Sequence, residues 1–109
     1  QTTLGAQIST AVNLLNNFIR EIDDNELYLK IVQLKTLAER GVITYIPKRL
    51  QRIQKDLRRT SGKSRMTHDE ALAEIIEMAK QYSAYYMAQE SQLNEQETNA
   101  EIILSESFK

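Results

Sequence analysis

The chain has 109 residues, with 14 Lys or Arg, 15 Asp or Glu and no Cys, and its formal net charge is −1. This length suits one domain that buries its own core, and the absence of cysteine excludes disulfides, thiol nucleophiles and cysteine-ligated metal centres. No apolar run approaches the roughly 20 residues that cross a bilayer, and the first residues lack the pattern of a signal peptide, so we expect no membrane partner.

The composition favours helices over sheets, because Gly and Pro are scarce and Leu, Ile, Ala, Glu, Gln and Lys dominate. We predict an all-α fold, an antiparallel helical bundle of four helices with a long C-terminal helix. The first residue is Gln1 and not Met, so we expect residues 1–109 to be a single helical-bundle domain excised from a longer chain. A chain without cysteine suits a reducing compartment, and we expect a cytoplasmic location.

The first predicted helix begins after a capping Thr2 or Thr3 and ends at the acidic turn that starts with Asp23. Its apolar face is formed by Leu4, Ile8, Ala11, Val12, Leu15, Phe18, Ile19 and Ile22. The second helix follows a cap at Asp24 or Asn25 and stops at Gly41, with Leu27, Ile31, Leu34 and Ala38 on one face. The turn between them is short, which predicts antiparallel neighbours.

The third predicted helix has Pro47 in its first turn and ends in the loop of residues 60–64. Its apolar face consists of Ile46, Leu50, Ile53 and Leu57. The fourth helix begins at a capping box formed by Thr67 and Glu70. It is apolar over a wide arc, which predicts that it lies at the centre of the bundle.

The sequence turns polar after Ala88, and we treat residues 89–109 as a polar C-terminal extension. Leu93, Ala100, Ile103 and Leu104 have the spacing to continue the fourth helix, whereas residues 101–105 have the composition to lie extended in a groove. We favour the continuous helix.

Residues 47–65 contain eight Lys or Arg and one acid. Helical geometry places four of the cations in a stripe of roughly 16 Å opposite the apolar face of the third helix. These are Lys48, Arg52, Lys55 and Arg59, and Lys63 and Arg65 follow in the loop. The charge is segregated, since residues 41–66 carry eight bases and one acid, whereas residues 67–109 carry two bases and nine acids.

We interpret these six cations as an interaction site and the chain as a non-catalytic interaction or assembly module. Its basic helix face would dock on a partner protein or on a second copy. The alternative function is sequence-tolerant contact with the phosphate backbone of a nucleic acid. A third reading is an ordinary solvated helix face, in which Asp56 pairs with Arg52 and Arg59.

Other candidate sites are explained by local structure. His68 is the only histidine, and it lies beside Asp69 and Glu70 in the first turn of a helix, where these side chains do not converge on one point. The acids from Glu21 to Glu26 lack the spacing of a calcium loop, and Gly62-Lys63-Ser64 lacks the rest of a phosphate-binding loop. Tyr82, Tyr85 and Tyr86 have the spacing of core residues, although tyrosines beside a basic stripe could stack on bases. We therefore expect no enzyme, no catalytic residue, no cofactor, no metal and no small-molecule substrate.

Overall fold

The computed structural model describes the backbone of residues 3–107 and the side chains of residues 3–96. The described chain is all-helical, with no strand, and its four helices pack against one another. They are α1 (Leu4–Ile19), α2 (Asn25–Arg40), α3 (Tyr45–Arg58) and α4 (His68–Ser107). The predicted fold class is confirmed, including the long last helix.

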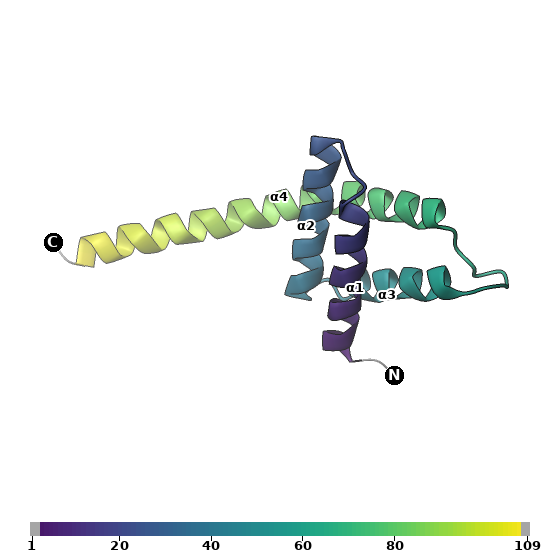
Figure 1. Ribbon diagram of the computed structural model, residues 1–109. Helices are drawn as coiled ribbons and strands as arrows, with labels where there is room; N and C mark the ends of the chain where they lie inside the picture. Colours follow the sequence, from purple (N-terminus) through teal and green to yellow (C-terminus); the bar gives the residue numbers. More distant parts are fainter. Residues whose placement is uncertain (1–2, 108–109) are drawn as a thin grey trace.

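The helices form two antiparallel hairpins that cross each other (Figure 1). The hairpin of α1 and α2 lies in front in this view, and the hairpin of α3 and α4 lies behind it. Helix α1 packs mainly on α3 and α2 packs mainly on α4, while α3 and α4 touch each other less closely. The outer side of the α3–α4 layer is therefore left uncovered by the first hairpin.

Short polar residues set the ends of the first hairpin. The Thr3 hydroxyl accepts a hydrogen bond from the Ala6 N–H at 3.2 Å, and the Asp24 carboxylate accepts one from the Leu27 N–H at 3.1 Å. Gly41 ends α2 with φ of 68°, the left-handed conformation that glycine adopts without strain. Helix α1 ends before Ile22, which packs on the core from the turn instead.

The loop between α3 and α4 is tied to the end of α3. The Asp56 carbonyl accepts hydrogen bonds from the N–H groups of Arg59 and Met66, at 3.3 and 3.1 Å. The predicted capping box then starts α4, since the Glu70 N–H donates to the Thr67 hydroxyl at 3.2 Å and the Thr67 N–H donates to the Glu70 carboxylate at 3.0 Å. These backbone and capping hydrogen bonds thus fix the direction in which α4 leaves the loop.

All four helices contribute to one core. Its largest fully buried side chains are Leu15, Ile31, Leu34, Ile46, Leu50, Ile53, Ile75 and Pro47. Gln33 and Asp56 are the two buried polar or charged residues among those described. Because the aliphatic residues of α3 face this core, the opposite side of α3 is left to its polar and charged side chains and to Tyr45.

Helix α4 extends far beyond the body of the domain (Figure 1). Its 40 residues span about 60 Å at a rise of 1.5 Å per residue. The radius of gyration is 17.6 Å, against about 13 Å for a compact domain of this length. The prediction that α4 lies at the centre of the bundle is therefore wrong, because α4 packs mainly on α2 and its second half projects outward.

The expected continuation of α4 through the polar extension is observed, as one helix to Ser107, and Phe108 and Lys109 lie outside the described residues. Within the described residues, no helix combines the length and the apolar character needed to cross a membrane.

Candidate interaction surface

The cations predicted to lie on the outer side of α3 are exposed there. We call Lys48, Arg52, Lys55 and Arg59 the basic row; all four are exposed, while Ile46, Leu50 and Ile53 on the opposite side are buried. The side chains of Arg52 and Arg59 are 60% and 47% exposed. The amphipathic pattern of the sequence thus translates directly into a charged outer face.

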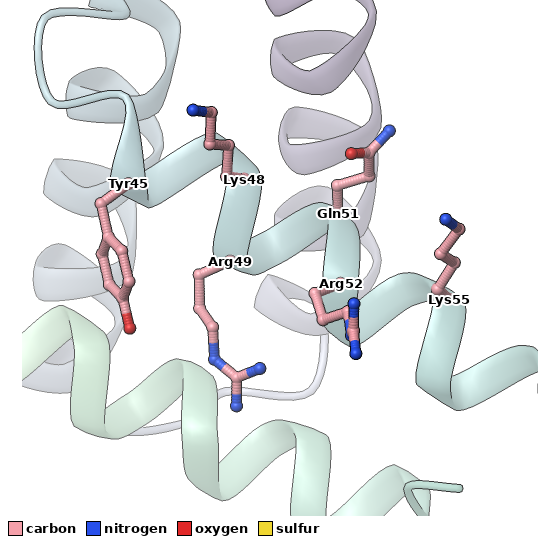
Figure 2. Close-up of a pocket in the computed structure, with 6 residues that line it drawn as sticks. All are labelled: Tyr45, Lys48, Arg49, Gln51, Arg52 and Lys55. Carbon is pink, nitrogen blue, oxygen red and sulfur yellow. The ribbon is translucent and has the colours of Figure 1, made fainter. Parts of the chain in front are cut away.

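An open hollow lies along the basic row, with a volume of about 270 Å³. Figure 2 shows Tyr45 and Arg49 directed toward the neighbouring helix, while Lys48, Gln51 and Lys55 point to the other side of α3. The hollow is lined by Tyr45, Lys48, Arg49, Gln51, Arg52 and Lys55. It therefore collects four cations, an aromatic ring and an amide on one helix.

Sequence reasoning placed three of these six residues in the site and missed Tyr45, Arg49 and Gln51. Their positions in the helical repeat flank the basic row, so a wider arc of the wheel would have included them. Lys63 and Arg65 are exposed in the loop after α3, and neither they nor Arg59 line the hollow. The structure thus splits the predicted site into a hollow on α3 and a basic loop beyond it.

Asp56 neutralises part of the basic row from within α3. Its carboxylate lies 3.2 Å from Arg59 Nε and 3.9 Å from Arg52 Nε, as the sequence predicts. The Asp56 side chain is only 8% exposed, so the two guanidinium groups also shield a buried charge. Substitution of both arginines would leave that carboxylate without its partners.

One further ion pair connects the hollow to α4. Arg49 donates to the Glu74 carboxylate through Nε at 3.1 Å and through a terminal nitrogen at 2.6 Å. Lys48 and Lys55 make no ion pair with any residue whose side chain the structure describes, and the same holds for Lys63. The two lysines are the charges of the hollow that no described carboxylate pairs with.

Helix α4 carries acids beside the basic row. Glu70, Glu74 and Glu77, which we call the acidic row, follow the i, i+4, i+7 spacing of one helix face. The bond from Arg49 to Glu74 shows that this row borders α3, and Glu70 and Glu77 are exposed. The Thr67 backbone and hydroxyl hydrogen bonds, with a smaller contribution from Arg65, lower the pKa of Glu70.

One aromatic side chain, that of Tyr45, lies at one end of the hollow. Tyr45 is 55% exposed. Burial, and more weakly the nearby Tyr45, raise the pKa of Tyr82, which is packed partly against the core. Of the three tyrosines assigned to the core from sequence, Tyr82 and Tyr86 pack against it, whereas Tyr85 is 43% exposed.

His68 and the acids of the α1–α2 turn have structural roles. The His68 ring stacks on buried Phe18, with the ring centroids 4.6 Å apart, and its Nε2 lies 2.7 Å from a Glu21 carboxylate oxygen. Asp24 caps α2, and Glu26 pairs with Lys30. Within the described part of the chain, no three His, Cys, Asp or Glu side chains are grouped as metal ligands.

Comparisons with protein-family models, with curated proteins and with solved structures gave no match for this chain.

Proposed function

We propose that the chain is a non-catalytic docking module that binds an acidic surface of a partner protein through the outer face of α3. The observation that carries this proposal is the exposure of the basic row along a hollow, with Lys48 and Lys55 left unpaired by described residues. Carboxylates that entered the hollow would meet these two charges without first displacing an internal partner. On sequence grounds, we place this role in the cytoplasm.

Two features suit a protein partner. The cations lie on a rigid helix, so their spacing is set before binding and little ordering of the backbone is needed. Arg49 and Arg52 are held toward carboxylates of the chain itself, which limits the positive charge to a few positions. Charged groups arranged in this way contribute more to the alignment of the two partners and to the association rate than to the affinity.

The test uses a fluorescently labelled acidic polypeptide of about 20 glutamates as probe, with binding followed by anisotropy at low and physiological salt. We expect the variant Lys48→Gln/Arg52→Gln/Lys55→Gln to bind at least tenfold more weakly. This variant keeps Arg59, so Asp56 retains its closer partner.

The matched control is Arg20→Gln/Lys30→Gln/Lys80→Gln, which removes the same charge from other parts of the surface and should bind nearly as well as the unchanged chain. Equal losses in the two variants, or no binding by the unchanged chain, would overturn the proposal.

A second candidate function is contact with single-stranded nucleic acid, and the position of Tyr45 is the observation that favours it. An exposed aromatic ring beside a row of cations is the combination on which bases stack while phosphates are held. Tyr45→Ala separates the two functions. It should weaken binding of a mixed-sequence single-stranded DNA of about 20 nucleotides roughly tenfold, and leave polyglutamate binding unchanged.

A further inference from the structure

We infer that the partner of the α3 face is a second copy of this chain, bound so that the basic row of each copy lies on the acidic row of the other. This inference rests on the proposed docking function and names its partner. It is carried by two exposed rows of opposite charge, one on α3 and one on α4, and by the Arg49–Glu74 bond that joins these two helices.

The two rows are compatible with a two-fold axis, whichever way the two helices run. An axis parallel to the helices, placed above this face, moves α3 of one copy over α4 of the other and reverses no helix direction. The basic row then faces the acidic row twice, once on each side of the axis. This is an isologous interface, in which one surface patch is its own complement, and it closes at two copies.

The neighbouring rows also favour a partner of mixed charge over a uniformly acidic one. Above the face, the field of Lys48, Arg52 and Lys55 is partly cancelled by Glu70 and Glu77, because opposite charges at short spacing screen each other at a distance. A partner that carries a basic row and an acidic row at the same spacing makes favourable contacts with both rows of this face. The chain itself carries that pattern.

The size of the face predicts a weak dimer. Helix α3 is about 20 Å long, and two adjacent helices are about 20 Å wide, so each copy buries roughly 400 Å². This is about half the area per partner of a standard stable interface. Association should therefore be visible only at high protein concentration, and it should depend strongly on salt.

Sedimentation equilibrium of the 109-residue chain is the first measurement. At about 0.01 M salt, where screening is weakest, we expect the average mass to rise with concentration from 12.6 kDa toward twice that value. At about 1 M salt the mass should return to that of the monomer.

Charge reversal is the decisive measurement. The basic-row variant is Lys48→Glu/Lys55→Glu. The acidic-row variant is Glu70→Gln/Glu77→Lys/Gln81→Lys, in which Gln81 follows Glu77 by one turn of α4. Both variants alter only exposed side chains, and they shift the net charge by equal and opposite amounts. Gln at position 70 retains the capping box. We expect each variant alone to be monomeric and their equimolar mixture to form a heterodimer, because both pairs of rows are again complementary.

The control variant Arg20→Glu/Lys80→Glu has the same net charge as the basic-row variant and should dimerise like the unchanged chain. A chain that stays monomeric at every salt concentration would overturn the inference, as would a mixture that fails to associate or a control that loses the dimer. If the chain is monomeric but still requires its basic row to bind polyglutamate, self-pairing fails while the docking function survives.

Discussion

Helix α3 is held on α1 by aliphatic and aromatic side chains of the common core, whereas α4 is held on α2 by core side chains together with polar contacts. The Ser83 hydroxyl donates to the Gln33 side-chain carbonyl at 3.0 Å, and the Gln33 amide donates to Met87 Sδ at 3.7 Å. About one turn further along α4, the side chains of Gln89 and Glu90 accept hydrogen bonds from the Arg40 guanidinium, which also lies over the Tyr86 ring.

This difference shows that apolar burial and hydrogen bonds have separate roles in the fold. Apolar burial is non-directional and supplies most of the stability, while hydrogen bonds fix register and angle. On α1, helix α3 is held mainly by the first, because its apolar side is buried against the core. Helix α4 needs both, because it must leave the body of the domain in a defined direction.

The largest expected effect comes from the core of α3. Leu50 is fully buried, so Leu50→Ala should lower the free energy of unfolding by about 2–5 kcal/mol, measured by urea denaturation. Val42→Ala, at a position 69% exposed, is the control and should change it by less than about 0.5 kcal/mol. A loss below about 1 kcal/mol for Leu50→Ala would show that α3 is not held by this core.

The polar contact between α2 and α4 should contribute less. Gln33→Leu leaves the Ser83 hydroxyl without its acceptor and should cost about 1–2 kcal/mol in the same denaturation experiment. Adding Ser83→Ala should recover part of the loss, since removal of both partners leaves no orphaned group. Strictly additive losses in the double variant would mean that the two side chains act independently.

A smaller effect is expected at the outer end of the same contact. The Arg40 and Glu90 side chains are both partly exposed, so Arg40→Ala should cost about 0.5–1 kcal/mol. Its clearer signature is local, with faster amide hydrogen exchange in α4 after Tyr86 and no change in α3. Unchanged exchange in α4 would show that Arg40 does not secure this part of the helix.

The smallest effect concerns the start of α4 and depends on pH. The Thr67 hydrogen bonds lower the pKa of Glu70 in the folded chain, so the unfolded chain binds the proton more readily. The resulting stabilisation is present above the pKa of the unfolded carboxyl and is lost as the pH falls through the lowered folded value. In thermal unfolding, the advantage of the unchanged chain over Glu70→Gln should shrink as the pH falls from about 5; an advantage independent of pH would contradict this assignment.

Sequence patterns predicted the helices well where local chemistry decides them. Thr3, Asp24, Gly41 and the Thr67–Glu70 box each fixed an end that the structure confirms, because a cap depends only on residues within one turn. The pairing of Asp56 with Arg52 and Arg59 was likewise predictable from i, i+4 and i, i+3 spacing.

Features set by contacts between distant helices could not be predicted. Gln33 looks like a solvated residue in the sequence, and its burial depends on Ser83 and Met87, about 50 residues later. Tyr85 and Met87 lie on the two flanks of the apolar arc of α4 and stay exposed, so the width of this arc did not mark a central helix. The ion pair of Arg49 depends in the same way on Glu74, which lies 25 residues later on α4.

The projection of α4 has a mechanical consequence. A rod anchored near Tyr86 and continuing to Ser107 extends about 30 Å past its last aromatic contact, so a tilt of about 10° at the anchor would move its far end by roughly 5 Å. The contacts of Arg40 with this helix thus lie at the point about which it would tilt. A small change of angle there produces a displacement several times larger at the far end of the helix.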